Sequence, residues 1–528
     1  MGLIQSARNL GRYQSTVLVI SALGLLATTP TSFGVLVIAP NLQHWCVHDA
    51  VSNQTEEQQR LSVGQCTRPD LNITSDDEFS ISNESAMVNC DRFEYDHSQF
   101  DYTATEKYNL VCDRQWLIPF ASSVFMMGYF LGSPTSGMLS DRFGRKKILL
   151  ASAVVGFLVN ILSAYAPNVI VFLLARLVLG IIDMSFFTTG LVLVAELVRK
   201  DQRIIGKFAD SFARRIVDMF VGAFSMIVSD YRALHIAVAG AYLLQVVAVA
   251  WFVCESPRWL ATRDRKQEAA EVVRRIAKFN GQALERSQHL LHVQDENATK
   301  SARISDIVRR PVVRLRTFVL FGIWSAAILC RYAIGFNLGS FSADVRVSLM
   351  ISGALEAPAV ILAAWAANRY GRQVSLFAVM LLSGVCCFCM SPLVGDVHGD
   401  VSTALFALAI AGKVLTSTLL FFVFLWSPEL YPTALRSTGL GACSTVARVA
   451  AIAAPQLGLL SRYWPPLMVV VLGVVAVAGA LLVPMLPDTT GAELPQTIED
   501  GERFQADHRY GYRFPVRRDN KDDADSEL

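Results

Sequence analysis

The chain has 528 residues, of which 53% are hydrophobic and only 17% are charged, and its formal net charge is +2. Soluble proteins carry about 25% charged residues, so this composition argues against a soluble fold and is typical of a membrane protein. The small net charge gives no indication of nucleic-acid binding, and the positions of the charges along the chain are more informative.

Residues 1–15 form a short polar N-terminus that we expect to be cytosolic, and a long apolar run follows from Val17 to Ala39. A secretory signal would have a shorter apolar core of about 7–15 residues and a cleavage site soon after it. The run therefore predicts a retained first membrane helix. This helix opens an N-terminal half that we place at residues 16–253.

A large polar insert at residues 41–116 interrupts this half. Its fourteen acidic and five basic side chains give it a net charge of −9. It contains an even number of cysteines, Cys46, Cys66, Cys90 and Cys112, and three glycosylation acceptors, Asn53, Asn72 and Asn83. These features predict an extracellular, glycosylated and disulfide-bonded loop. Four cysteines allow three pairings, and the sequence does not choose among them or exclude free thiols.

Gly137–Lys147 is a short basic stretch with four cationic side chains and one carboxylate. The apolar runs at 117–138 and 148–166 flank it, and each has about the 20 residues that a membrane helix needs. We predict a tight cytosolic turn, because Lys and Arg concentrate in cytoplasmic loops. Its charges either fix the topology only, or form a gate in which Asp141, Arg142 and Arg145 make charge-assisted bonds.

The remaining apolar runs bring the predicted number of membrane helices to twelve. They lie at 169–190, 204–228, 234–253, 317–339, 345–367, 374–393, 403–426, 437–460 and 465–486. This number places both termini and every basic connection in the cytosol. The middle connection, 254–316, has fourteen basic and eight acidic residues and includes a predicted basic amphipathic helix at 266–280. The C-terminal half spans 317–486, and 487–528 is a cytosolic tail.

The two halves repeat one pattern. The stretch 368–373 resembles 141–146, and Glu429 follows the second copy as Glu196 follows the first. Parallel six-helix halves of this kind enclose a cavity at mid-membrane and rock against each other. The repeat predicts a set of gating residues at the cytosolic side, namely Asp141, Arg142, Arg145, Glu196, Arg369, Arg372, Glu429 and Arg436.

Several motifs resemble those of a known family. They are the G-x-x-x-D-R-x-G-R-K pattern at 137–146, Glu255-Ser-Pro-Arg-Trp-Leu260, Glu429-Leu-Tyr-Pro-Thr-Ala-Leu-Arg436 and Leu486-Pro-Asp-Thr-Thr-Gly491. Together with the cysteine-bearing loop, they are similar to the organic ion transporter family of the major facilitator superfamily. The resemblance implies carriage of small organic cations, anions or zwitterions across the plasma membrane, driven by gradients of substrate, ions or membrane potential.

The resemblance also indicates substrate-binding residues. Glu356 matches an acid of the cation and carnitine branches of the family, and Arg448 matches an arginine of the anion and carnitine branches. A carboxylate for an ammonium group and a guanidinium for a carboxylate suit a zwitterion. The alternative is that the two side chains pair with each other or with other protein groups.

The seventh predicted helix carries Trp324 and, about two turns later, Arg331 and Tyr332. The family has an aromatic residue in place of Arg331, so this arginine favours anionic groups and puts simple cation transport in doubt. The fifth predicted helix carries Asp210, Arg214 and Asp218. Their spacing predicts a row of alternating charge on one face, which either lines the cavity or forms an internal ion-pair stripe.

Some buried polar positions are expected to be structural, or have no precedent in the family. Arg176 and Lys413 match structural basic positions, and Asp183 has no counterpart. The cysteines at 386, 387 and 389 lack a histidine or a second pair of cysteines, so we predict no metal site. No phosphate-binding G-x-x-x-x-G-K-[ST] motif occurs, and no nucleophile and base stand together.

We therefore expect a secondary transporter without enzyme activity and without a cofactor. Its leading substrates are organic cations or zwitterions of the carnitine kind. An organic anion transporter is the first alternative, and a membrane receptor or scaffold on the same fold is the second. The expected partners are the substrate, the lipid bilayer and a coupling ion that the sequence does not identify.

Overall fold

The protein is all-α, with twelve long helices in the part of the chain that the computed structural model describes. It describes residues 11–46, 66–69, 87–90, 92–198, 203–281, 310–341, 344–395, 400–432 and 435–489. The first six long helices are α2 (Arg12–Phe33), α6 (Leu117–Phe143), α7 (Arg145–Ala164), α8 (Val169–Leu197), α9 (Arg203–Ile227) and α10 (Tyr231–Phe252). The second six are α15 (Pro311–Phe336), α16 (Val345–Arg369), α17 (Arg372–Met390), α18 (Asp400–Leu430), α19 (Arg436–Ala453) and α20 (Leu467–Leu482).

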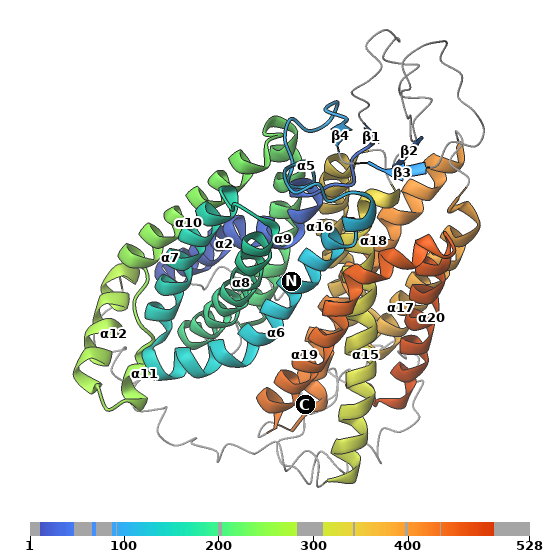
Figure 1. The fold of residues 1–528 in the computed structure, drawn as a ribbon. Coiled ribbons are helices and arrows are strands. Elements are labelled where there is room, and N and C mark those ends of the chain that lie inside the picture. Colours follow the sequence, from blue (N-terminus) through green and yellow to red (C-terminus); the bar gives the residue numbers. More distant parts are fainter. Residues whose placement is uncertain are drawn as a thin grey trace, which may run out of the picture.

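Short elements connect or extend these helices. They are α3 (Val35–Ile38), α5 (Ala104–Lys107), α11 (Pro257–Thr262), α12 (Lys266–Asn280) and the 3-10 helices η1 (Cys112–Arg114), η3 (Leu338–Phe341), η4 (Ser391–Leu393), η5 (Ala454–Arg462) and η6 (Val483–Met485). In Figure 1 the first six helices, coloured blue to green, lie beside the second six, coloured yellow to red. The predicted architecture of two six-helix halves is therefore confirmed.

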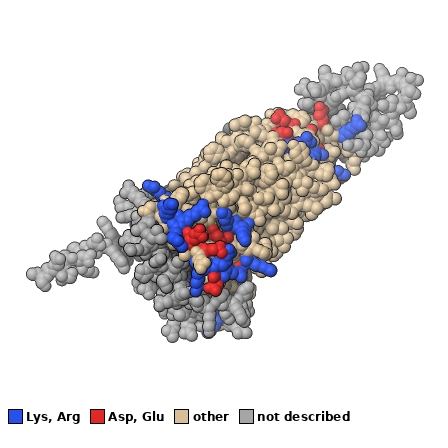
Figure 2. Space-filling view, turned by 90° about the vertical axis from the view of Figure 1, so that its left-hand side faces the viewer, with Lys and Arg blue, Asp and Glu red and all other residues tan. Residues whose placement is uncertain are grey.

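The long helices have the composition of membrane spans. Eleven of them are long and apolar enough to cross a membrane. Large apolar side chains such as Trp251, Leu362 and Leu481 are more than half exposed on the outside of the bundle. Figure 2 shows charged side chains gathered toward the two ends of the molecule, with a broad uncharged band between them. The twelfth long helix, α9, is the exception because it carries four charged side chains between residues 210 and 218.

The basic stretch is not the loop that the sequence predicted. Helix α6 continues to Phe143 and α7 begins at Arg145, so Gly144 alone separates them. Gly144 has a φ of +104°, which is unfavourable for any residue with a side chain. The apolar pattern located only the lipid-facing part of each helix, because helix ends that reach water can be polar. For the same reason α8 and α18 extend beyond their predicted ends, to Leu197 and Leu430.

The large loop joins the helices at the opposite end of the bundle. Strand β1 (His44–Cys46) pairs with β4 (Phe93–Tyr95), and β2 (Thr67–Pro69) pairs with β3 (Met87–Asn89), both antiparallel. Disulfides join Cys46 to Cys90 and Cys66 to Cys112. The structure thus adopts one of the three pairings that the sequence allowed. The three predicted glycosylation sites lie outside the described residues. We name this end the disulfide end, and the end with Gly144 and Gly371 the basic end.

Helices α9 and α16 bring the two halves into backbone contact. A Cβ atom on Gly353 of α16 would lie 2.6 Å from the backbone nitrogen of Met219 in α9. A Cβ atom on Gly222 of α9 would lie 2.7 Å from the carbonyl oxygen of Arg346 in α16. Small residues of this kind allow membrane helices to approach closely. The two glycines therefore set the separation of the halves along this line.

Gly353→Ala should destabilise the folded protein, because the added methyl group meets backbone atoms that cannot rotate away. Overpacking of this kind costs about 1–3 kcal/mol. The measurement is the thermal unfolding midpoint of the purified protein in detergent. Gly240→Ala in α10 is the matched control, since no atom lies within 4 Å of its Cβ position. Equal midpoints for the two variants would contradict backbone contact between α9 and α16.

Candidate functional site

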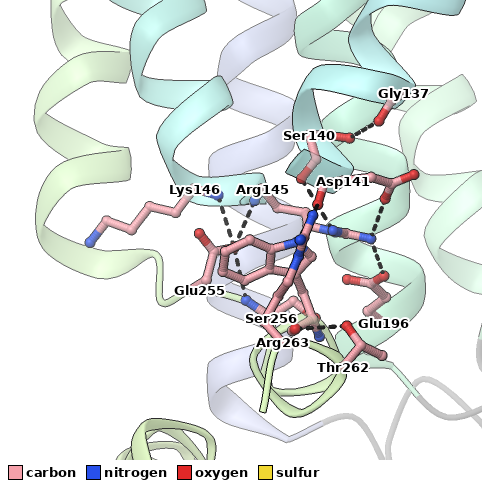
Figure 3. Close-up of polar contacts among 11 residues, drawn as sticks. Gly137, Ser140, Asp141, Arg145, Lys146, Glu196, Glu255, Ser256, Thr262 and Arg263 are labelled. Carbon is pink, nitrogen blue, oxygen red and sulfur yellow. Dashed lines mark hydrogen bonds and ion pairs between the residues drawn. The ribbon is translucent and has the colours of Figure 1, made fainter. Parts of the chain in front are cut away.

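Arg145 is the centre of a polar cluster at the basic end (Figure 3). Its guanidinium Nη2 lies 2.8 Å from Asp141 Oδ1 in α6 and 3.0 Å from Glu196 Oε1 in α8. Its Nη1 donates to the carbonyl oxygen of Ser140 at 3.2 Å. Arg145 and Glu196 are largely buried, whereas the Asp141 side chain is 71% exposed. Arg145 thus joins three helices of the first half.

Glu255 caps the helix that Arg145 begins (Figure 3). Its Oε1 accepts the backbone N–H groups of Arg145 at 2.8 Å and of Lys146 at 3.1 Å. A carboxylate is favoured there because the first N–H groups of a helix have no partner within the helix. The carbonyl oxygen of Asp141 accepts Trp259 Nε1 at 2.8 Å and Arg263 Nη2 at 2.9 Å. The predicted gating motif therefore binds residues before, within and directly after α11.

The second half repeats this cluster. Gly371 has a φ of +94°, and Arg372 follows it at the start of α17. Arg372 Nε lies 3.0 Å from Glu429 Oε2 in α18. Thr489 also donates to Glu429, at 2.5 Å. The sequence repeat therefore corresponds to a repeated helix–glycine–helix unit with an Arg–Glu pair.

The other predicted gating residues occupy the same end. Arg142 lies over the ring of its neighbour Phe143, Arg369 ends α16, and Arg436 begins α19. Within the described ranges, every ion pair at the basic end stays inside one half. Control of switching by these residues is still a prediction.

The central charge cluster surrounds Glu356 of α16, which is 1% exposed. Arg215 Nη1 of α9 lies 2.7 Å from Glu356 Oε2. Lys413 Nζ of α18 lies 3.6 Å from Glu356 Oε1, and Arg331 Nη1 of α15 lies 3.8 Å from Glu356 Oε2. Asp218 adds a second carboxylate, 3.8 Å from Arg215. Three cations from three helices thus enclose Glu356, and one of them comes from the other half of the protein.

The charged face of α9 divides into two parts. Arg214 and Asp210 pair at 3.6 Å, and both are about one-quarter exposed. Arg215 points instead toward the second half and binds Glu356. The alternating row predicted from residues 210, 214 and 218 therefore omits Arg215, the residue of α9 that binds Glu356. The glycines at 222 and 353 could have indicated where α9 meets α16, and hence the importance of Arg215.

The structure does not bring Glu356 and Arg448 together. The Arg448 guanidinium of α19 lies over the ring of Tyr129 in α6, 5.3 Å from its centroid. No ion pair among the described residues includes Arg448, and its Nε has no hydrogen-bond partner there. Three cations surround Glu356 in this structure, in line with the alternative that it pairs with other protein groups, and its contact with a substrate stays a prediction.

Trp324, another predicted substrate residue, is buried in this conformation. It is 0% exposed, donates its indole N–H to Ser427 at 2.8 Å and packs edge-on against Phe424. It is therefore part of the core of the second half and does not face a cavity in this conformation. Tyr332 stacks on Phe336 with ring centroids 5.8 Å apart. The buried Arg331 also donates to the hydroxyl of Ser417.

A cavity of about 380 Å³ lies between the halves at the disulfide end. Its lining includes Gln99 and Gln115 of the first half and Asn337 and Arg462 of the second, and none of the five predicted substrate residues. Within the described residues, three side-chain hydrogen bonds join the halves at this end. They are Arg346 to the Gln99 carbonyl at 2.6 Å, Gln456 to Ser123 at 3.1 Å and Arg462 to Gln115 at 2.7 Å.

Comparisons with known proteins agree with this architecture. The profile of the "Sugar (and other) transporter" family matches residues 79–499. An "Organic cation transporter protein" of Drosophila melanogaster is 32% identical, covering 80% of this chain and 78% of its own length. The chain belongs to the organic ion transporter family of the major facilitator superfamily. It is a transporter and not an enzyme, as the sequence predicted.

Further relatives and a solved structure extend the comparison. "Solute carrier family 22 member 3" of Mus musculus is 29% identical, covering 84% of this chain and 81% of its own length. "Solute carrier family 22 member 6" of Mus musculus is 28% identical, covering 78% and 76%. The xylose transporter XylE from E. coli, in an inward-open conformation, aligns with a TM-score of 0.60 at 17% identity. That alignment covers 93% of this chain and 99% of XylE and shows the shared fold.

Glu196→Gln should destabilise the first half more than Asp141→Asn does. Loss of the Glu196 charge weakens the main buried partner of Arg145, which costs about 1–3 kcal/mol. The exposed Asp141 pair contributes about 0–1 kcal/mol. Thermal unfolding midpoints of the two purified variants provide the comparison. A larger loss of stability for Asp141→Asn would show that the exposed pair dominates.

Proposed function

We propose that this chain carries small zwitterions of the carnitine kind across the plasma membrane by alternating access. The observation that carries the proposal is Arg448, a buried guanidinium at the interface of the two halves with no acidic partner among the described residues. A buried cation inside a membrane protein is costly unless a partner reaches it. A substrate carboxylate would supply that partner.

The charge of the whole central region supports an anionic group on the substrate. The side chains described there include five cations, Arg214, Arg215, Arg331, Lys413 and Arg448, and three carboxylates, Asp210, Asp218 and Glu356. With ordinary ionisation the region has an excess of two positive charges. A negative substrate group reduces this excess, whereas a simple cation increases it.

Aromatic rings and the named relatives support a cationic group on the same substrate. Tyr129 lies under Arg448, and Tyr332 and Phe336 stack nearby in α15. The faces of such rings attract ammonium groups. The Drosophila relative is named as an organic cation transporter. A carboxylate and an ammonium on one small molecule satisfy both observations, so we favour zwitterions over organic anions.

We further propose the orientation and the state of the protein. The basic end would face the cytosol, since Lys and Arg mark cytoplasmic loops, and both termini would lie there. The disulfide end would be extracellular, because disulfides form in oxidising compartments. The three hydrogen bonds between the halves at the disulfide end support an inward-facing state.

Arg448→Ala should selectively weaken carriage of carboxylate-bearing substrates. Loss of one charge-assisted contact is worth about 1.5–3 kcal/mol, roughly tenfold to a hundredfold in affinity. Labelled carnitine, tetraethylammonium and benzoate serve as zwitterion, cation and anion in uptake assays on cells that express the chain. Carnitine and benzoate uptake should fall, while any tetraethylammonium uptake is retained. The matched control is Arg274→Ala on the exposed face of α12, with surface expression measured for each variant.

Three outcomes would contradict the proposal. Carriage of benzoate without carnitine would indicate an organic anion transporter. Carriage of tetraethylammonium alone, unaffected by Arg448→Ala, would indicate a cation transporter. Surface expression without carriage of any of the three would favour a receptor or scaffold.

Glu356→Gln should reduce carriage of all carried substrates alike. The substitution removes the negative charge that Arg215, Lys413 and Arg331 share, and the remaining cations repel one another. Uptake of the same three compounds and the thermal unfolding midpoint measure the effect. Selective loss of tetraethylammonium uptake with unchanged stability would show instead that Glu356 contacts the substrate directly.

A further inference from the structure

Asp183 lies at the centre of α8 and is completely buried. Fourteen residues of the helix precede it and fourteen follow it, so it is about 21 Å along the axis from either end. Its side chain is 0% exposed. An ionisable group at such depth is costly and usually has a function. Neither the gating motifs nor the central charge cluster accounts for it.

Two neutral hydroxyl groups contact the Asp183 carboxyl. Thr31 of α2 donates to Oδ2, and Tyr242 of α10 donates to Oδ1. None of the ion pairs within the described part of the chain includes Asp183. Arg176, two turns earlier on α8, donates instead to the carbonyl oxygen of Thr31 at 2.5 Å. Arg176 and Asp183 thus both contact Thr31 and form no ion pair with each other.

The Thr31 hydroxyl has a second acceptor. Its Oγ1 also lies 2.6 Å from the carbonyl oxygen of Thr28. A hydroxyl group has one proton to donate, so it can serve only one of the two acceptors at a time. When Asp183 is ionised, Thr31 donates to it. When Asp183 is protonated, its O–H group can donate to Thr31 Oγ1, while Thr31 turns its own proton to Thr28.

We propose that Asp183 is a proton-binding site, and that binding of a proton there is coupled to substrate carriage. The step adds one proton from water to a carboxylate oxygen and forms one O–H bond, without any change in oxidation state. Rotation of one hydroxyl keeps the surrounding groups hydrogen-bonded in both protonation states. The coupling part of this inference rests on the proposed function, whereas the proton site does not.

A continuous set of contacts leads from this site to Arg448. The Arg176 guanidinium lies 4.5 Å from the ring centroid of Phe125 in α6. The ring centroids of Phe125 and Tyr129 are 5.0 Å apart, and the Arg448 guanidinium lies over the ring of Tyr129. Protonation of Asp183 removes a negative charge near Arg176 and changes the electrostatic field at the rings of Phe125 and Tyr129. The proposed proton site and the proposed carboxylate site thus lie at the two ends of one stack.

Other charged or titratable groups lie near this region on several of the neighbouring helices. They are Arg176 on α8 itself, Tyr129 on α6, Arg214 on α9, and His235 and Tyr242 on α10, while α2 contributes the hydroxyl of Thr31. Of these groups and Asp183 together, only Asp183 is a carboxyl group. A measurement that detects only carboxyl groups therefore separates Asp183 from His235.

Among the described residues, a carboxyl group at the disulfide end could give the same signal as a protonated Asp183. Partial burial raises the pKa of Glu106, so its signal must be separated from that of Asp183. Partial burial acts in the same sense on Asp344, but hydrogen bonds from Arg346 outweigh it and lower the pKa of Asp344. Glu106→Gln is therefore the necessary control, and Asp344 stays ionised.

Infrared difference spectra of the full-length protein in nanodiscs test the proton site directly. As the pH falls from neutral to mildly acidic, wild type should gain a carbonyl band of a protonated carboxyl group. Glu106→Gln should retain this band, and in that background Asp183→Asn should lose it while the ion-paired Asp218→Asn keeps it. A band that persists in Asp183→Asn in that background, or the absence of any such band in wild type, would overturn the inference. This measurement needs no substrate.

Proteoliposomes with an imposed pH gradient test the coupling, with labelled carnitine as the probe. Wild type should accumulate carnitine in response to the gradient. Asp183→Asn should lose this accumulation but retain exchange of internal for external carnitine, because exchange needs no net proton movement. Thr31→Val should also lose accumulation, and Thr31→Ser should restore it.

Different results would contradict the coupling and the proposed function. Gradient-driven accumulation that is unchanged in Asp183→Asn would overturn the coupling. A wild-type protein that neither accumulates nor exchanges carnitine would contradict the proposed function, and the infrared spectra would still decide whether Asp183 binds a proton.

Discussion

The 2.7 Å contact between Arg215 and Glu356 joins the two halves of the protein inside the membrane. Charges buried in a bilayer must be balanced by protein groups, and here the balance is achieved across the interface between the halves. The contact occurs where glycines hold α9 and α16 at backbone distance. If the halves rock against each other, this line is the natural pivot, because movement there is smallest and the charge pair can persist.

The sequence predicted the architecture well because its strongest signals are lengths and repeats. Apolar runs of membrane length identified the helices, and the copies of Asp141–Lys146 and 368–373 identified the two halves. The predicted helix ends were wrong wherever a helix extends into polar surroundings, as α6 does to Phe143. Hydrophobicity marks the bilayer, whereas a helix ends where its hydrogen bonding ends.

The candidate site was predicted less completely. Glu356 and Arg331 were predicted as substrate contacts, and the structure places both in one charge cluster. Arg215 comes from the other half, so no local pattern could pair it with Glu356. Asp183 was noticed only as a position without precedent, because its partners Thr31 and Tyr242 lie 152 and 59 residues away in sequence. Contacts between distant helices depend on packing, which the sequence does not display.

At the disulfide end, Arg346 donates to the main-chain carbonyl of Gln99 and not to its side chain. Every amino acid supplies the same carbonyl oxygen, so replacing the residue at position 99 does not by itself remove the acceptor. The large loop can therefore diverge in sequence between relatives while the contact that closes this end is preserved. The surface of the disulfide end can then change over evolution without loss of this contact between the two halves.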